Sequence, residues 1–281
     1  MTQRLWRIGL LGCLTILAAG CAVEAPSSRT TPSLLDGDGP GSALISREWW
    51  ILLTVATAIF VLVVALMLAA VVRQRRRRSA QADMTAAPAA PHVDGGTRWI
   101  WLGGIAMPFI VLLGVFALNV RDIQALGNPP STEVAAVKIE GHRWWWKVEY
   151  PDLGITTANQ LYIPAGQSVK VQLTSADVIH SFWVPQLQFK RDLIPGQTNT
   201  IWLQADKPGV YRALCAEYCG LQHAQMHFMV VALDPVDWGK WVEHEGSDAV
   251  KPSDSLTQAG QQVFLGTTCV YCHAIRGTPA A

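Results

Sequence analysis

The sequence predicts an all-β Greek-key domain that is anchored in a membrane by an N-terminal hairpin of two helices. Apolar residues are concentrated in two long runs before residue 121, whereas short strand-like stretches alternate with turn signals after residue 133. Half of the 281 residues are hydrophobic, which is enough for one ordinary domain plus membrane segments. The net charge is only +1 at pH 7, so the overall charge gives no reason to expect nucleic-acid binding.

The first residues have the layout of a secretory signal. Residues 1–20 carry Arg4 and Arg7, then an apolar run, then small residues. The segment that ends at Cys21 resembles the lipobox of bacterial lipoproteins, which implies that Cys21 is lipidated. The alternative is a retained membrane helix, but the run is short for the ~20 apolar residues that a span needs. Residues 21–46 are rich in Pro, Ser, Thr and Gly and predict a flexible extracytoplasmic tether.

Residues 47–121 are expected to form the transmembrane hairpin, with spans at 49–72 and 99–120. Each span opens with tryptophans, which settle at membrane interfaces. The run Arg73 to Arg78 lies in the short loop between the spans, so the positive-inside rule places it in the cytoplasm. Two crossings then put everything after Arg121 on the extracytoplasmic side.

Residues 122–245 are expected to form the β domain, and 246–281 a linker followed by a truncated cytochrome c-like segment. Seven strand-like stretches are separated by turn signals such as Pro-Ala-Gly and Lys-Pro-Gly, which suits a Greek-key sandwich or barrel. The stretches are VAAVKI, WWWKVEY, QLYI, SVKVQLT, NTIWLQ, GVYRAL and HFMVVAL. A polar linker covers Gly246 to Ser255, and a helix is expected to begin near Leu256.

Side chains with soft nitrogen and sulfur donors are grouped inside the β domain. They are His180, Cys215, Cys219, His223 and Met226, and Glu217 lies between the two cysteines. Two thiolates, two imidazoles and a thioether favour copper over hard cations, and a mononuclear blue-copper site needs only one cysteine. The second cysteine therefore predicts a dinuclear centre in which Cys215 and Cys219 bridge two metal ions. His180 and His223 would each bind one copper, with Met226 and the Glu217 carbonyl as weak ligands.

The same residues are also compatible with a disulfide or with a zinc site. Two cysteines four residues apart in an exported domain could form a disulfide. Two cysteines and two histidines could hold a structural zinc ion, although that site would leave Met226 unexplained. His142 and His227 have no partner that the sequence can assign.

The cluster Cys-x-Glu-x-Cys-x-x-x-His-x-x-Met and the segment DVIHSFWVPQLQFKRDLIPG resemble the cytochrome oxidase subunit II family over about Trp49 to Asp234. The resemblance implies a cupredoxin-like fold and a CuA centre held by the six residues named above. It implies that electrons pass from cytochrome c to haem in subunit I, where oxygen is reduced and protons are translocated. The Glu217 side chain is implied to reach a magnesium ion shared with subunit I. The implied location is the bacterial inner membrane, multi-pass, with the copper domain periplasmic and other oxidase subunits as partners.

An aromatic segment, Gly141 to Trp146, also resembles the family. The resemblance implies that Trp144 is the residue through which electrons enter. Aromatic clusters are more often core or interface packing. Asp177 and Asp192 resemble acidic positions that dock a cationic cytochrome or contact subunit I.

A C-x-x-C-H pattern at Cys269, Cys272 and His273 is typical of covalent haem c attachment. Both thiols would bond the haem vinyl groups, and His273 would be the proximal ligand. Its place after an exported copper domain resembles the fused cytochrome c of some family members. Only eight residues follow His273 and no methionine follows Met229, so we expect either that the sequence is truncated or that the haem domain is incomplete.

Three rival functions share features with the oxidase subunit. Nitrous-oxide reductase shares the dinuclear copper motif, but it is typically soluble, and the two spans argue against it. A quinol oxidase subunit II has the same fold without the copper ligands, which are present here. A copper chaperone or sensor would bind metal without passing electrons, and a stable purple chromophore would argue against it.

Overall fold

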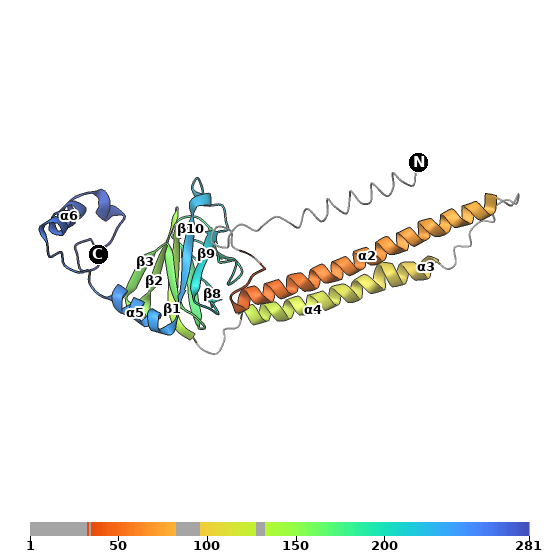
Figure 1. The fold of residues 1–281 in the computed structure, drawn as a ribbon, viewed down its shortest axis with the longest axis horizontal. Coiled ribbons are helices and arrows are strands. Elements are labelled where there is room, and N and C mark those ends of the chain that lie inside the picture. Colours follow the sequence, from red (N-terminus) through yellow and green to blue (C-terminus); the bar gives the residue numbers. More distant parts are fainter. Residues whose placement is uncertain (1–32, 34, 83–95, 128–132, 281) are drawn as a thin grey trace.

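A computed structural model describes residue 33 and residues 35–82, 96–127 and 133–280. They form a pair of long helices, a β sandwich and a C-terminal segment with two further helices (Figure 1). The expected signal segment and Cys21 lie outside the described residues.

The predicted hairpin is present as two long helices that lie side by side in Figure 1. Helix α2 spans Pro40–Ala82, and the second helix is continuous through α3 (Gly96–Trp99), the π-helix η1 (Ile100–Ala106) and α4 (Met107–Gly127). Both are long and apolar enough to cross a membrane, judged by length and composition. Their side chains are largely exposed within this chain, as expected of surfaces that face lipid or another subunit. The two predicted spans are confirmed as apolar helices, but the helices extend to Ala82 and Gly127, so the arginine run is helical and does not lie in a loop as expected.

The expected tether ends earlier than residue 46, which corrects that prediction. Helix α2 begins at Pro40, because proline is favoured in the first helical turn, where its missing N–H costs nothing. Just before the helix, Asp38 N–H donates to Gln186 O at 2.8 Å, and Asp206 N–H donates to Asp38 O at 2.7 Å. The chain before α2 is therefore hydrogen-bonded to the β domain rather than free.

Two five-stranded sheets form the β sandwich, as predicted. The first has the strand order β3-β2-β1-β5-β8 and the second β4-β10-β9-β6-β7. The strands are β1 (Glu133–His142), β2 (Trp145–Tyr150), β3 (Ile155–Ala158), β4 (Gln160–Pro164), β5 (Ser168–Ser175), β6 (His180–Trp183), β7 (Arg191–Leu193), β8 (Asn199–Leu203), β9 (Gly209–Cys215) and β10 (His227–Leu233). All seven predicted stretches are strands. Strands β3, β6 and β7 were missed because each has only three or four residues, too few for a clear alternation.

The core between the sheets is apolar and aromatic. Strand β10 alternates buried and less buried residues along its length, which turns every second side chain inward. Trp146 on β2 is fully buried, and its ring centroid lies 5.1 Å from that of Phe228 and 6.3 Å from that of Phe182. The imidazole of His180 is 5.9 Å from the same indole. This aromatic cluster therefore supports the end of the sandwich where His180 lies.

The C-terminal part begins with a helix that was not predicted from the sequence. Helix α5 (Pro235–Gly246) starts at Asp234, whose carboxylate accepts two backbone N–H groups of the first turn. Its Trp241 stacks on Tyr162 with ring centroids 4.7 Å apart, which holds the helix against the sandwich. The expected later helix is confirmed as α6 (Ser255–Gly266).

We predict that Trp146→Ala destabilises the protein by about 3 to 5 kcal/mol, because it leaves a large cavity in a fully buried cluster. Trp145→Ala is the matched control, since that neighbouring side chain is 37 % exposed and its loss should cost under about 1 kcal/mol. Urea unfolding of the detergent-solubilised chain, followed by circular dichroism, measures both. Equal losses of stability would show that the core does not depend on Trp146.

Candidate metal centre

The candidate metal centre is built from one strand and one loop. Cys215 is the last residue of β9, and Met226 directly precedes β10. Cys215 N–H donates to Met226 O at 3.0 Å, which closes the loop between them, and Ala216 N–H donates to Ser181 O at 2.9 Å, which ties the loop to β6. His180 begins β6. Two segments that are distant in sequence, the start of β6 and the loop from Cys215 to Met226, thus meet at one end of the sandwich.

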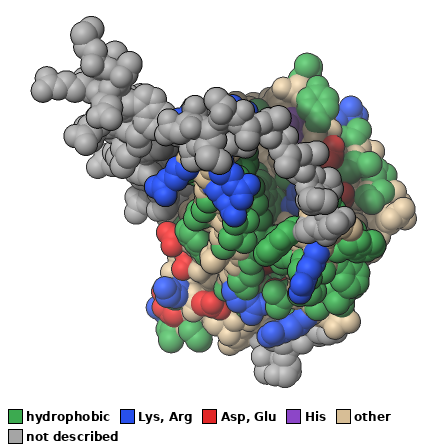
Figure 2. Space-filling model, turned by 90° about the vertical axis from the view of Figure 1, so that its right-hand side faces the viewer, with side chains coloured by type: hydrophobic (Ala, Val, Ile, Leu, Met, Phe, Trp, Pro, Cys, Tyr) green, Lys and Arg blue, Asp and Glu red, His purple; other side chains and the backbone are tan. Residues whose placement is uncertain are grey.

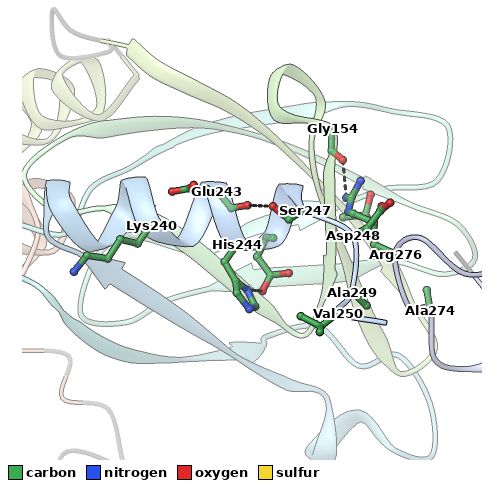
Figure 3. A pocket seen from close by; sticks show the side chains of 12 residues that line it. Gly154, Lys240, Glu243, His244, Ser247, Asp248, Ala249, Val250, Ala274 and Arg276 are labelled. Atoms are coloured by element: carbon green, nitrogen blue, oxygen red, sulfur yellow. Dashed lines mark hydrogen bonds and ion pairs between the residues drawn. The ribbon is translucent and has the colours of Figure 1, made fainter. Parts of the chain in front are cut away.

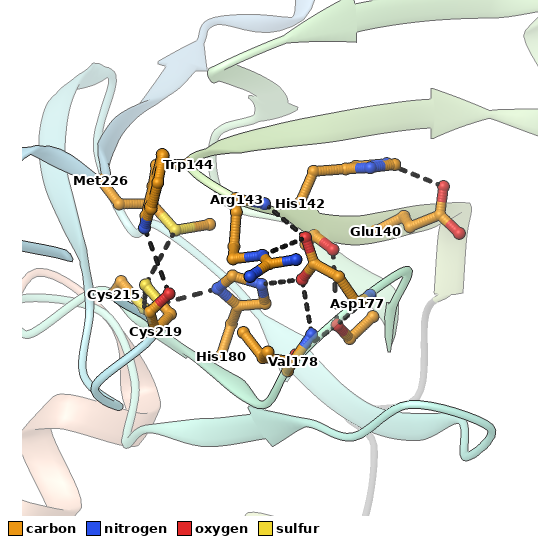
Figure 4. Close-up of polar contacts among 12 residues, drawn as sticks. Glu140, His142, Arg143, Trp144, Asp177, Val178, His180, Cys215, Cys219 and Met226 are labelled. Atoms are coloured by element: carbon orange, nitrogen blue, oxygen red, sulfur yellow. Dashed lines mark hydrogen bonds and ion pairs between the residues drawn. The ribbon is translucent and has the colours of Figure 1, made fainter. Parts of the chain in front are cut away.

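The two thiols are close but separate. Their Sγ atoms are 3.9 Å apart, whereas a disulfide bond is about 2.05 Å long, and both are free cysteines. The Nδ1 atom of His180 is 3.9 Å from Cys215 Sγ, and the Nδ1 atom of His223 is 3.7 Å from Cys219 Sγ. Each sulfur therefore has an imidazole nitrogen beside it. Figure 4 shows the ring of His180 pointing toward the two cysteines.

The two expected weak donors complete the group. The carbonyl oxygen of Glu217 is 3.2 Å from Cys215 Sγ, and Met226 Sδ is 3.6 Å from Cys219 Sγ. His180 is fully buried, and Cys215, Cys219 and Met226 are also buried. All six predicted residues are brought together. Their sulfur and nitrogen donors fit copper, and two bridging sulfurs fit a pair of metal ions better than one.

Asp177 supports this cluster in a way that was not predicted from the sequence. Its Oδ1 lies 2.8 Å from Nε2 of His180 and accepts from Val178 N–H at 2.6 Å, while its Oδ2 accepts from Arg143 N–H at 2.7 Å. Burial raises the pKa of Asp177, but these hydrogen bonds outweigh it and lower the pKa to about 2. The ionised carboxylate keeps the proton of His180 on Nε2, so Nδ1 is free to face the sulfurs. The Asp-x-x-His spacing was the only sequence signal of this contact.

The two thiols differ in acidity. Burial raises the pKa of Cys215, but hydrogen bonds, first of all with His180, outweigh it and lower the pKa to about 7. Burial and the neighbouring Cys215 charge raise the pKa of Cys219 to about 12. One thiolate therefore forms readily and the second only when a cation is present. Metal binding at this pair must release a proton from Cys219.

Trp144 lies against the metal-binding loop. Its indole Nε1–H donates to Cys219 O at 3.1 Å. Gly220 has a φ of +115°, and a Cβ there would come within 3.3 Å of the indole, so this position needs glycine for two reasons. Trp144 is half-buried, whereas Trp145 is exposed and Trp146 lies in the core. Trp144 thus contacts the loop from outside, whereas Trp146 packs against His180 from the core.

The outer rim of the loop is exposed. The side chain of Glu217 faces solvent, and Tyr218 and Leu221 are 73 % and 93 % exposed. Asp192 is exposed on β7, where it pairs with Ser181 in the sheet register. Asp192 is therefore near the site but outside the donor group.

The C-x-x-C-H motif lies in the C-terminal segment, apart from the metal centre. Cys269, Cys272 and His273 are all exposed, and His273 N–H donates to Cys269 O at 3.0 Å. A cleft of about 760 Å³ separates α5 from this segment, and across it Arg276 donates to Gly154 O at 2.8 Å (Figure 3). Among the described residues 247–280 none is buried, so this segment has no closed core around the motif.

Comparison with known proteins gives matches to subunit II of cytochrome c oxidase. The family model for the periplasmic domain of cytochrome c oxidase subunit II matches residues 154–233. Cytochrome c oxidase subunit 2 of Alkalihalophilus pseudofirmus is 40 % identical over 177 residues, which are 63 % of this chain and 50 % of that protein. The same subunit of Bacillus sp. (strain PS3) is 32 % identical over 182 residues, 59 % of this chain and 51 % of that protein. The chain thus spans about half the length of these relatives.

A solved structure is also similar. It is the periplasmic domain of subunit II of cytochrome oxidase of Bradyrhizobium japonicum, which is 31 % identical and has a TM-score of 0.39. The match covers 40 % of this chain and 92 % of that one.

We predict that Asp177→Asn weakens copper binding by about 10- to 100-fold, because the amide no longer fixes the His180 tautomer as an anion does. Asp192→Asn removes the same charge from the neighbouring strand and should leave the affinity unchanged. Competition with a chelator, at fixed pH, measures both affinities. If the two variants bind copper equally well, Asp177 does not orient His180.

We also predict that Cys219→Ser abolishes binding of the second copper ion, since a bridging thiolate is lost. Met226→Leu should keep both ions and shift the reduction potential, because it removes only a weak donor. Copper content and the visible spectrum of the two purified variants check this. An unchanged spectrum in Cys219→Ser would contradict the assignment of the bridge.

Proposed function

The chain belongs to the cytochrome c oxidase subunit II family, and from this we propose that it is the electron-entry subunit of a bacterial cytochrome c oxidase. A dinuclear copper centre held by its residues would take electrons from cytochrome c and pass them to haem in subunit I, where oxygen would be reduced and protons translocated. The observation that carries the proposal is the buried pair of thiols 3.9 Å apart, each with an imidazole nitrogen beside it.

Six residues would hold the two copper ions. They are His180, Cys215, Glu217 through its carbonyl, Cys219, His223 and Met226. Copper bound there would accept and release single electrons. The protein supports this by keeping the donors buried and by packing the aromatic cluster around Trp146 beneath them. A rigid site with little water needs little rearrangement when its charge changes.

Trp144 is the proposed entry residue. It is half-buried, so one part of the indole is accessible to a donor while its N–H bonds the backbone of Cys219. That hydrogen bond joins the protein surface to a bridging ligand. Tyr218 and Leu221 of the same loop are exposed and suit a transient docking partner.

Glu217 is proposed to serve two metals. Its carbonyl oxygen faces Cys215, whereas its carboxylate is exposed and could bind a magnesium ion shared with subunit I. Carboxylate oxygen is a preferred ligand of magnesium. One residue would then connect the copper centre to the subunit interface.

The C-terminal motif is proposed to carry haem c. Cys269 and Cys272 are exposed and available to bond the haem vinyl groups, and His273 would be the proximal ligand. The hydrogen bond from Arg276 to Gly154 would hold this segment at the β domain. Cytochrome c, fused or soluble, is the proposed donor.

The proposed location is the bacterial inner membrane. Helix α2 and the α3–η1–α4 helix would both cross it, with the β domain in the periplasm and residues 1–20 acting as a signal that exposes Cys21 for lipidation. Subunit I and other oxidase subunits would cover the exposed apolar faces of the two helices. The ion pair between Arg47 and Asp122, in which one guanidinium nitrogen lies 2.6 Å and 2.7 Å from the two carboxylate oxygens, supports a paired arrangement of these helices.

The test of electron entry is Trp144→Phe. We expect copper reduction by reduced cytochrome c to slow by at least about tenfold, because the N–H bond to the loop is lost, while copper content and thermal stability stay near wild type. Stopped-flow absorbance measures the rate in the assembled enzyme. Trp145→Phe is the matched control and should react like wild type. Equal rates for all three proteins would remove Trp144 from the electron path.

A further inference from the structure

Helix α2 continues beyond its apolar part into an arginine cluster, made up of Arg73, Arg75, Arg76, Arg77 and Arg78. All five side chains are exposed. None of them makes an ion pair with another residue that the structure describes. These charges therefore lack a partner within the described part of the chain.

Three of the arginines share a groove with apolar residues. The groove has a volume of about 620 Å³. It is lined by Leu68, Ala69, Val72, Arg73, Arg76 and Arg77. Because side chains four apart lie on one helix face, the six residues form two adjacent rows, 68-72-76 and 69-73-77. In each row the residues nearer the apolar part of α2 are apolar, and those nearer its C-terminal end are basic.

The surrounding helices do not neutralise this charge. Between residues 49 and 82 helix α2 has no acidic residue, and neither has the second helix between residues 96 and 121. Glu48 and Asp122 are the nearest acidic residues in the described hairpin, and both lie at the opposite end. Figure 2 faces the end where α2 finishes and shows basic side chains beside apolar ones. The groove therefore offers positive charge next to a hydrocarbon-like surface.

We propose that this groove is a binding site for one anionic phospholipid. One acyl chain lies along Leu68, Ala69 and Val72, and the phosphodiester meets the guanidinium groups of Arg73, Arg76 and Arg77. Guanidinium groups bind phosphate oxygens through paired hydrogen bonds, and basic residues just beyond a membrane helix attract anionic lipids. A free phosphate ion would contact only the arginines of the groove. A zwitterionic lipid would be bound more weakly by these arginines than an anionic lipid.

The proposal rests on the membrane topology proposed above, but not on the copper centre. A run of arginines can also act only as a diffuse charge that orients the hairpin. In that case the position of each arginine on the helix does not matter. A specific groove predicts the opposite, since Arg73 and Arg77 line it and Arg75 and Arg78 do not.

Two double variants with the same charge change distinguish a specific groove from a diffuse charge. Arg73→Gln with Arg77→Gln changes the groove, and Arg75→Gln with Arg78→Gln is the matched control. The full chain is reconstituted in phosphatidylcholine bilayers that contain a minor fraction of spin-labelled phosphatidylglycerol. The motionally restricted fraction of the label gives the affinity. Copper content and circular dichroism confirm that each variant is folded, independently of lipid binding.

We expect the groove variant to bind phosphatidylglycerol about 25-fold more weakly, since it loses two arginines that meet the phosphodiester and each contributes roughly a fivefold preference. The control variant should stay within about twofold of wild type. Equal losses in both variants, or no loss in either, would overturn the proposal. Displacement of the labelled lipid by inorganic phosphate at matched ionic strength would also overturn it, because the site would then be an anion site without the acyl contact.

Discussion

The metal centre depends on one constraint, the approach of two buried thiols to 3.9 Å without a bond between them. Apposed thiols in a closed loop would oxidise to a disulfide if they could move closer, and would titrate independently if they moved apart. The hydrogen bond between Cys215 N–H and Met226 O and the bond between Ala216 N–H and Ser181 O restrain this loop. The loop therefore holds two sulfurs where a pair of cations can lie between them and the imidazoles.

The sandwich supplies the rigidity that the loop needs. Gly141 on β1 lies so close to His180 that a Cβ there would come within 2.8 Å of the imidazole. The same imidazole is held by Asp177 on its other nitrogen and by the indole of Trp146 beneath it. A histidine that is fully buried and restrained on three sides keeps one ring orientation, whatever the state of the metal.

The position of this domain over the hairpin is also fixed by hydrogen bonds. Ser42 in the first turn of α2 donates from its hydroxyl to Gln186 O at 2.7 Å, and its N–H donates to Leu187 O at 3.1 Å. Gln186 and Leu187 follow β6, which begins with His180. Only a few hydrogen-bonded backbone residues thus connect the metal centre to the membrane helices. The height of the centre above the membrane therefore does not depend on a flexible linker.

Local patterns allowed much of this structure to be predicted from the sequence. Apolar runs identify the helices, and alternating stretches such as the β10 residues identify the longer strands. The donor types at Cys215, Cys219 and Met226 identify a soft metal site before any geometry is known. Their convergence with His180, 35 residues away from Cys215, followed from the family resemblance, because spacing alone does not give strand register.

Contacts across the chain could not be predicted in the same way. The bond between Arg143 and Asp177 joins residues 34 apart, and strand β6 is buried along nearly all of its four residues, so no alternation marks it. The docking of residue 38 on the β domain was hidden by a composition typical of linkers. Helix α5 had a local signal, because Asp234 and the proline after it are typical of a helix start. An Asp–Pro pair is also typical of the turn that follows the last strand of a β domain.

The most direct test of the central claim is anomalous X-ray diffraction at the copper edge from crystals of the copper-loaded chain. The account predicts two anomalous peaks, each within bonding distance of the sulfurs of both Cys215 and Cys219. A single peak, or a Cys215–Cys219 disulfide beside an empty cluster, would contradict it.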